Sequence, residues 1–486
     1  MFKIIPVFFI CSMLFAAGIF SQEETDTTLT PEENTTITED TNQVTETDPV
    51  KLEISRIIKE VNSRSKEIDA YVYIKKAAAM TNAELGLLNK KVAGAIVKAA
   101  DEVLNGKYRE HFVVDVYQAG AGTSHNMNTN EVLANRGVEI LGGKRGDYKL
   151  INPNDHVNMA QSTNDTFPTA MRLASLIMAQ RLMPVIKHFQ KTLEKKAKQF
   201  SKVIKSGRTH LQDAAPITLG QEFEGYAEIV SRHHDLILTS QKHLAELGIG
   251  GTAVGTGLNT HAKYRNLMAK NLSKVSGLRL RPTKNYFESM QSMMPFMELS
   301  SAINNFAIDM TKITNDLRLL ASGPTTGFAE IIMPAVQPGS SIMPGKVNPS
   351  MAEMMNQVLY QVMGNNHTVM MCSQAGQLEL NVMMPVMIFN IVWMIEILKN
   401  ALKAFDDKCV AGLIADEKKC RDYAEKSISI VTALNPIIGY ARAAEIAKES
   451  VKTHRSIMDV IRSKNIMPEK ELNKVLDLMK LTKPGL

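Results

Sequence analysis

The sequence predicts a mainly α-helical protein built around a central bundle of long helices. Apolar residues recur at steps of three and four over long stretches, which is the spacing of one face of an α-helix. Two such runs extend from Leu219 to Leu244 and from Ile303 to Leu320, and neither contains a Pro. No long segment alternates apolar and polar residues with the period of two that a sheet protein requires. Runs of this length are typical of bundle helices rather than of helices that cover a parallel sheet.

Two segments precede the predicted folded body. Lys3 is followed by an apolar run from Ile4 to Phe20 and then by polar sequence, which is the pattern of a secretory signal peptide. A membrane helix is a weaker interpretation, because the run is short and has no basic flank. Residues 22–48 are acidic and Thr-rich without any Lys or Arg, and predict a disordered tether. We therefore expect residues 1–21 to be a signal peptide, the protein to be periplasmic or secreted, and no membrane contact after cleavage.

Charge and cysteine content argue against several classes of function. The chain has a formal charge of +6, and the body without the acidic tether is more basic still. Its cations are scattered among Glu and Asp along helical segments, so we expect a solvated surface and no nucleic-acid partner. Cys11 lies in the predicted leader, and Cys372, Cys409 and Cys420 form no CxxC pair. This pattern argues against a disulfide framework and against a metal site.

Gly-, Pro- and Asn-rich segments interrupt the helical pattern and predict the loops. They are residues 119–130, 151–168, 206–216, 248–259 and 337–349. Near Ala415 charged residues become more frequent and the predicted helices shorten, which indicates a separate C-terminal unit. We therefore divide the body into an N-terminal domain (49–162), a central helical-bundle domain (163–417) and a small C-terminal helical domain (418–486).

Four of these loops carry side chains that donate hydrogen bonds to anions. They contain Gly122-Thr123-Ser124, Ser162-Thr163-Asn164, Thr209-His210, and the segment from Gln337 to Pro349. Hydroxyl, amide and imidazole donors beside predicted helix starts suit small carboxylates. Taken singly, each is explained equally well as a helix cap or a turn. Their recurrence favours a dicarboxylate pocket.

The loop GSSIMPGKVNP at 339–349 resembles the signature of the aspartase/fumarase superfamily. The resemblance runs from about Tyr73 to Gly439 and includes GTSHNMNTNEVLANR, NPNDHVNMAQSTNDTFPTA and GRTHLQDA. Several positions resemble the aspartase branch rather than class II fumarases. These are Ser162-Thr163-Asn164, Gln337, Asn356-Gln357-Val358 and residues 376–383. One departure is the extended Tyr-Gly-x-Gln-Thr-x-Arg element of the family, which is not found between Lys51 and Lys75.

The resemblance implies a three-domain aspartase/fumarase-like fold and an ammonia-lyase that reversibly converts L-aspartate to fumarate. It implies Ser340 as the catalytic base, and Lys346 and His210 as further catalytic residues. The carboxylate next to carbon 3 would be held by Thr123, Ser162, Thr163 and Ser341. The other carboxylate would be held by Lys346 and Asn348, with Asn164, Thr209 and His210 near the amine. We also expect Glu353 to pair with His210 from behind the site.

Relatives in this superfamily build each site from loops of three subunits, so the resemblance implies a homotetramer. No cofactor is expected, although a divalent cation activates some relatives. Two other functions remain open: a fumarate hydratase that uses the same pocket, and an exported binding protein on the same scaffold. An assay with fumarate, with and without ammonium, separates the ammonia-lyase from the fumarate hydratase. Intact folding without turnover favours the exported binding protein.

Overall fold

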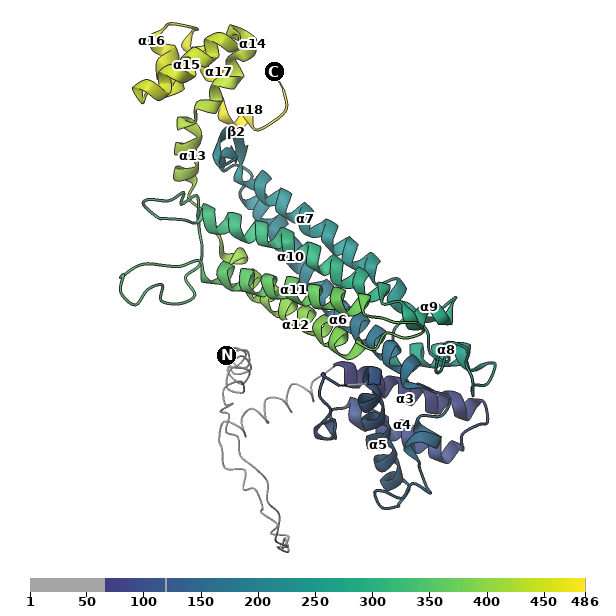
Figure 1. The fold of residues 1–486 in the computed structure, drawn as a ribbon. Coiled ribbons are helices and arrows are strands. Elements are labelled where there is room, and N and C mark those ends of the chain that lie inside the picture. The colour runs from purple at the N-terminus through teal and green to yellow at the C-terminus, as the bar shows by residue number, and fades with distance from the viewer. Residues whose placement is uncertain (1–65, 119, 486) are drawn as a thin grey trace, which may run out of the picture.

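The structure is a computed structural model that describes residues 66–118 and 120–485. Its described part is mainly helical, which confirms the predicted class. The predicted signal peptide and acidic tether lie outside the described residues. Three parts follow one another along the chain, and the middle one is an elongated bundle (Figure 1).

Five long helices form the central bundle. They are α6 (Thr163–Gln199), α7 (Leu219–Ser240), α10 (Met294–Leu320), α11 (Ser350–Gln374) and α12 (Met384–Lys408). The predicted apolar faces point inward: Phe223 and Val230 of α7 are fully buried, as are Ile303 and Phe306 of α10. Because α6 has 37 residues, it is about 55 Å long.

The N-terminal part packs against one end of the bundle. It contains α3 (Lys66–Glu84), α4 (Lys90–Leu104), α5 (Thr123–Ile140) and a π-helical turn at Pro153–Val157. A separate apolar cluster holds it together, with Ile96, Leu133 and Val138 at its centre. Tyr71 and Ile74 of α3 belong instead to the bundle core, so α3 joins the two parts.

The first helix of the C-terminal part adds Cys420 to the bundle core, and the short helices after it surround a third apolar cluster. The helices of this part are α13 (Glu417–Lys426), α14 (Asn435–Ile438), α15 (Tyr440–Thr453), α16 (Ile457–Ser463), α17 (Glu469–Val475) and α18 (Leu478–Leu481). The cluster includes Leu434, Ile446 and Val460. The domain boundaries at 162/163 and 417/418 stay a prediction. In the structure α6 begins at Thr163 and α13 begins at Glu417.

One feature of the fold bears on the expected loops. An antiparallel hairpin of β1 (Ile204–Thr209) and β2 (Gln212–Thr218) lies beyond the end of α6. The expectation that Thr209-His210 lies beside a helix start is therefore wrong, because these residues form the hairpin tip. The remaining α-helices and strands are α8 (Tyr264–Ser276), α9 (Tyr286–Gln291), β3 (Glu246–Leu247), β4 (Arg281–Pro282), β5 (Ile331–Ile332) and β6 (Ile414–Ala415).

One stretch in the described part of the chain, Met384–Gly412, is long and apolar enough to cross a bilayer. It comprises α12 and the turn that follows, and more than half of its most apolar window is buried inside the molecule. A core helix of a bundle has the same property.

Candidate active site

The start of α6 presents the first group of predicted donors. Ser162 is the N-cap, and its Oγ accepts the backbone N–H of Asn164 at 3.2 Å. Asp165 completes a capping box by accepting the N–H of Ser162 at 2.9 Å. Its second oxygen accepts the N–H groups of Gly250 and Thr252, each at 2.9 Å. The buried Asp165 carboxylate thus holds the glycine-rich loop against this helix start.

Two opposing effects act on the pKa of the Asp165 carboxyl. Burial raises its pKa to about 6, whereas the N–H groups of Ser162, Thr252 and Gly250 and the charge of Lys75 lower it. Nearby, Asn164 Nδ2 donates to Ala253 O at 2.8 Å, which fixes this amide at the edge of the same loop.

Thr123 lies at the first position of α5, where Gly122 precedes it as a left-handed N-cap. Its Oγ1 donates to Gly120 O at 2.6 Å and the residue is exposed. A Cβ on Gly122 would overlap the ring of Phe167, a residue of α6. Glycine at this position is what lets α5 start directly against α6, so Thr123 and Ser162 belong to one end of the bundle.

Thr209 and His210 lie at the hairpin tip with exposed side chains. His210 and Leu211 have φ angles of 56° and 59°, the left-handed values that a two-residue type I′ turn needs at both central positions. Such turns normally contain Asn-Gly or Asp-Gly. Non-glycine residues in this region are strained, and strain of this kind is concentrated at functional sites.

The 337–349 loop places Ser340 in an environment suited to a base. Ser340 Oγ accepts the backbone N–H groups of Ile342 and Met343, at 3.2 and 2.9 Å. Hydrogen bonds donated to an oxygen stabilise its deprotonated form and lower its pKa. No helix or strand is formed between Ile332 and Ser350, so the loop provides this geometry by itself.

Contacts across the loop hold its two arms together. Asn348 Nδ2 donates to Gly339 O at 2.5 Å, so Asn348 closes the loop. A Cβ on Gly339 would lie 1.5 Å from Lys346 O, so only glycine permits the crossing. Ser341 and Lys346 are exposed, and Lys346 is therefore free to face a ligand from outside this chain.

Glu353 does not contact His210 within one chain. Its carboxylate lies 3.8 Å from the guanidinium of Arg318, and no hydrogen bond or ion pair between Glu353 and His210 is formed in the described residues. The expected pairing stays a prediction for contacts between subunits.

Sequence reasoning missed a buried charged cluster at the root of the hairpin and the loop. Glu330 is fully buried, and its Oε1 accepts from Arg208 Nη1 at 2.8 Å. Lys205 Nζ lies 2.9 Å from Glu330 Oε2 and also donates to Glu222 at 2.8 Å. The Arg208 guanidinium stacks 4.3 Å from the centre of the Phe328 ring. The available sequence signal for this cluster was the pair of basic residues Lys205 and Arg208, which precede the Thr209-His210 motif.

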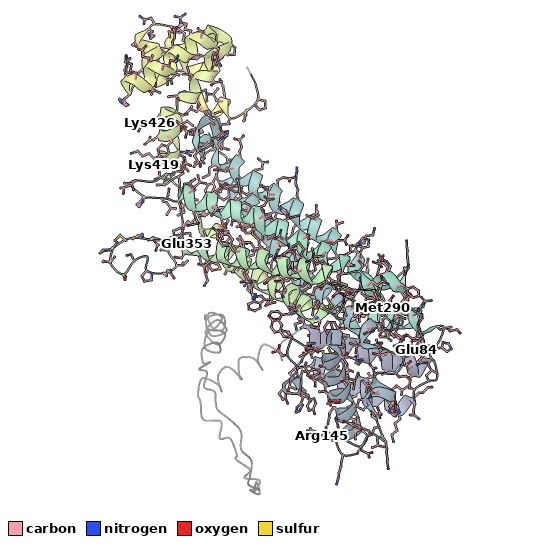
Figure 2. The ribbon with its side chains drawn as sticks, viewed as in Figure 1. Glu84, Arg145, Met290, Glu353, Lys419 and Lys426 are labelled. Carbon is pink, nitrogen blue, oxygen red and sulfur yellow. The ribbon has the colours of Figure 1, made fainter. Side chains whose placement is uncertain are left out.

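The predicted donors form two groups at opposite ends of the bundle. Thr123, Ser162, Thr163 and Asn164 lie where α6 begins, and the hairpin with Thr209 and His210 follows its other end (Figure 1). The 337–349 loop leaves the bundle at the hairpin end, where Glu353 is labelled, far from Glu84 and Met290 (Figure 2). The length of α6 separates the two groups by about 55 Å. One chain therefore cannot place all the predicted residues around a single small substrate.

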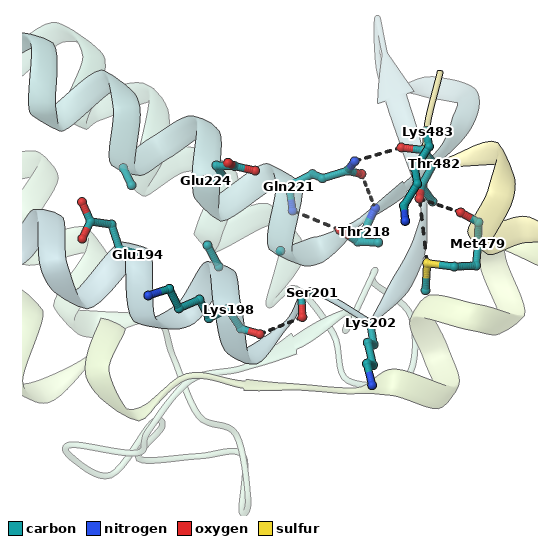
Figure 3. A pocket seen from close by; sticks show the side chains of 13 residues that line it. Glu194, Lys198, Ser201, Lys202, Thr218, Gln221, Glu224, Met479, Thr482 and Lys483 are labelled. Carbon is teal, nitrogen blue, oxygen red and sulfur yellow. Dashed lines mark hydrogen bonds between the residues drawn. The ribbon is translucent and has the colours of Figure 1, made fainter. Parts of the chain in front are cut away.

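Three cavities in the described part of the chain lie away from the predicted site residues. A cavity of about 790 Å³ lies between the end of α6, the start of α7 and α18. Gln221 Nε2 closes it by donating to Thr482 O at 2.9 Å (Figure 3). It contains none of the predicted site residues. In the described part of the chain, no group of three or more His, Cys, Asp or Glu is placed to hold a metal ion.

The fold and the donor set define a class of protein: a long helical bundle with donor-rich loops at both of its ends. Residues 40–364 match the family described as lyase, and residues 430–483 match the fumarase C C-terminus. The chain belongs to the aspartase/fumarase superfamily of lyases.

Individual relatives agree with this assignment. An aspartate ammonia-lyase from a Bacillus species is 49% identical over 85% of this chain and 88% of the relative. A class II fumarate hydratase from Bacillus anthracis is 43% identical over 86% of this chain and 90% of the relative. Among solved structures, a fumarate lyase:delta crystallin from Brucella melitensis bound to cobalt has a TM-score of 0.85 at 45% identity, covering 86% of this chain and 91% of its own. A class II fumarase from Schistosoma mansoni has a TM-score of 0.84 at 36% identity, covering 87% and 92%.

Proposed function

We propose that this chain is a carbon–nitrogen lyase that reversibly eliminates ammonia from L-aspartate to give fumarate. Aspartate ammonia-lyases at 44–49% identity, each matched over most of its length, support this activity. The observation that carries the proposal is Ser340, whose oxygen receives two backbone N–H groups on a loop with a free cation, Lys346. Formation of fumarate from aspartate, followed by its ultraviolet absorbance, tests it directly.

In the proposed mechanism the Ser340 oxyanion removes a proton from carbon 3 of aspartate. The electron pair moves into the adjacent carboxylate and gives a doubly charged aci-carboxylate, which then expels the amine from carbon 2. Thr123, Ser162, Thr163 and Ser341 stabilise that charge. By analogy with an oxyanion hole, each donor contributes about 2.7–4 kcal/mol.

The rest of the substrate is held by a second set of groups. Lys346 and Asn348 bind the other carboxylate, while Asn164, Thr209 and His210 lie around the amine. Glu353 of another subunit pairs with His210 and tunes it. Binding at both ends of the dicarboxylate aligns the hydrogen on carbon 3 with Ser340.

The active enzyme is proposed to be a homotetramer with each site shared by three subunits. The separation of the two donor groups within one chain supports this assembly. Exposed apolar side chains on the bundle offer a surface for it, including Leu238 of α7, Ile308 of α10, and Tyr360 and Met371 of α11. Light scattering of the purified body measures the mass of the assembly.

Fumarate hydratase is the second candidate, since a class II enzyme is 43% identical. The purified folded part of the protein is incubated with fumarate alone and with fumarate plus ammonium. Aspartate formed only with ammonium supports the ammonia-lyase, whereas malate formed in both supports the hydratase. A folded protein that binds fumarate but turns over neither substrate supports the exported binding protein.

Export and the absence of a cofactor are also proposals. Sequencing of the mature N-terminus in the extracytoplasmic fraction tests cleavage near residue 21, and Met1 on a cytoplasmic protein contradicts it. Turnover is expected to persist after chelation with EDTA, and addition of Mg²⁺ measures any activation by a divalent cation.

A further inference from the structure

Lys75 of α3 is a fully buried cation among neutral groups. Its Nζ donates to Asn126 Oδ1 at 2.6 Å, and to Asn158 Oδ1 and Gln161 Oε1 at 3.0 Å each. Asp165 acts on it at longer range, and no hydrogen bond or ion pair of Lys75 to a carboxylate is formed in residues 66–118 and 120–485. A buried charge normally faces a counter-ion, because burial otherwise costs free energy.

The ammonium determines how the Asn126 amide is oriented. Lys75 Nζ donates to three amide oxygens. In its protonated form it has three donors and no acceptor, so in that form the amide oxygen of Asn126 must face it. The amide nitrogen then faces the other way and donates to Thr163 Oγ1 at 3.2 Å and to Asn158 Oδ1 at 3.3 Å. The amide orientation follows from chemistry here, since the reverse orientation would oppose two donors at 2.6 Å.

The orientation of Asn126 in turn determines the role of the Thr163 hydroxyl. A hydroxyl has one proton to donate and two lone pairs. Because Thr163 accepts from Asn126, its own proton remains for another acceptor, and none is found for it in the described part of the chain. Thr163 is the first residue of α6, so this proton lies beside the positive end of a long helix dipole.

We propose that Lys75 and Asn126 are positioning residues that fix the Thr163 hydroxyl as a donor to the substrate carboxylate next to carbon 3. This inference rests on the proposed function, which places Thr163 at that carboxylate. Lys75 touches no substrate and acts through Asn126.

The test is Asn126→Asp. The new carboxylate has nearly the same shape and pairs with Lys75, so the fold is expected to keep its unfolding temperature. It can only accept, so the Thr163 hydroxyl turns its proton inward and is lost as a donor. We expect kcat/KM for aspartate to fall about 10- to 100-fold, less than the loss of about 10² to 10³ in rate for an oxyanion donor itself. Thr163→Val removes the donor itself and is expected to lose about 10² to 10³ in rate. The double variant is expected to lose no more than Thr163→Val alone.

The matched control is Asn158→Asp. It places the same charge against Lys75, but Asn158 does not contact the Thr163 hydroxyl, so kcat/KM is expected to stay within about threefold of the wild type. Equal losses in the two Asp variants would mean that the charge near Lys75 matters rather than the orientation of Thr163, and would overturn the inference. If Asn126→Asp does not fold, Asn126→Ala removes the same donor without adding an acceptor. The Thr163 hydroxyl is then unheld but not turned inward, so kcat/KM is expected to fall less than in Asn126→Asp and still below that of Asn158→Asp.

Calorimetric titration with fumarate separates this inference from the proposed function. Wild-type protein that forms no fumarate from aspartate refutes the proposed function, but fumarate binding still reports on Thr163. Weaker fumarate binding by Asn126→Asp than by Asn158→Asp supports the positioning role. Wild-type turnover and affinity in Asn126→Asp, beside a loss in Thr163→Val, would refute the positioning role alone.

Discussion

At the scale of residues, Ser340 lies on an exposed loop, and two backbone N–H groups donate to its oxygen. Ser340→Ala is expected to lower kcat by about 10³-fold or more and to leave KM nearly unchanged, because the lost group acts in the transition state. The loop is outside the core, so the unfolding temperature should not fall. Steady-state kinetics with aspartate measure both constants. Near-normal turnover would assign the role of base to His210.

Lys346 should respond differently to the same kind of substitution. It is exposed in the single chain and is proposed to bind a carboxylate in the ground state as well as in the transition state. Lys346→Ala is therefore expected to raise KM and lower kcat together. Lys426→Ala, an exposed lysine of α13 labelled in Figure 2, serves as the control. A change in kcat alone would show that Lys346 does not bind the ground state.

Lys75 is expected to make the free energy of unfolding depend on pH. Burial lowers its pKa from 10.5 to about 7, so between pH 7 and 10.5 the unfolded chain binds more protons than the folded chain. The free energy of unfolding should therefore rise with pH in this window, by up to about 1.4 kcal/mol per unit. Asp165, with a pKa of about 6, is already ionised there and adds no slope.

Urea unfolding of wild type and Lys75→Met between about pH 7 and 9 measures this contribution. The wild type should gain stability relative to the variant as the pH rises. Parallel curves for the two proteins would show that Lys75 keeps an ordinary pKa.

At the scale of elements, the Glu330 cluster joins the hairpin to the segment that leads into the 337–349 loop. Glu330→Gln leaves Lys205 and Arg208 without their shared carboxylate and is expected to cost about 3–5 kcal/mol. Because the hairpin carries Thr209 and His210, KM for aspartate should rise as well. Thermal unfolding and kinetics are compared with Glu224→Gln, an exposed position of α7. Unchanged stability would mean that the cluster is solvated in the assembly.

Helices were more predictable than the hairpin for a physical reason. The apolar spacing from Ile303 to Leu320 specifies one buried face, and α10 buries that face. Ser162 was predictable as a cap, because Asp165 follows at the position of a capping box. The hairpin lacks such a local signal: its turn is His210-Leu211 rather than Asn-Gly, and its buried cations pair with Glu330, 122 residues away from Arg208 along the chain. Long-range pairing of this kind leaves no periodic pattern in the sequence.

At the scale of the whole molecule, the length of α6 decides how a site can form. Motifs in the sequence predict which residues belong to the site, but no motif states that a 37-residue helix lies between them. A rigid helix of this length cannot bend Thr163 towards Ser340, so only association of chains brings the two groups within reach of one dicarboxylate. In the proposed tetramer, the exposed apolar residues of α7, α10 and α11 are the surface through which we expect the chains to associate.

Shared sites predict complementation between two inactive variants. Ser340→Ala and Thr163→Val are each expected to have greatly reduced activity, and neither substitution lies in the apolar core. When they are unfolded together in equal amounts and refolded, a site that takes Ser340 from one subunit and Thr163 from another is intact by chance in about one quarter of cases. The mixture should therefore regain roughly a quarter of wild-type activity, whereas each variant refolded alone should not. A mixture of Ser340→Ala and Lys346→Ala is the control, because both residues lie on one loop and every site then carries one defect. Recovery in the control, or none in the test mixture, would contradict a site built from the opposite ends of different chains.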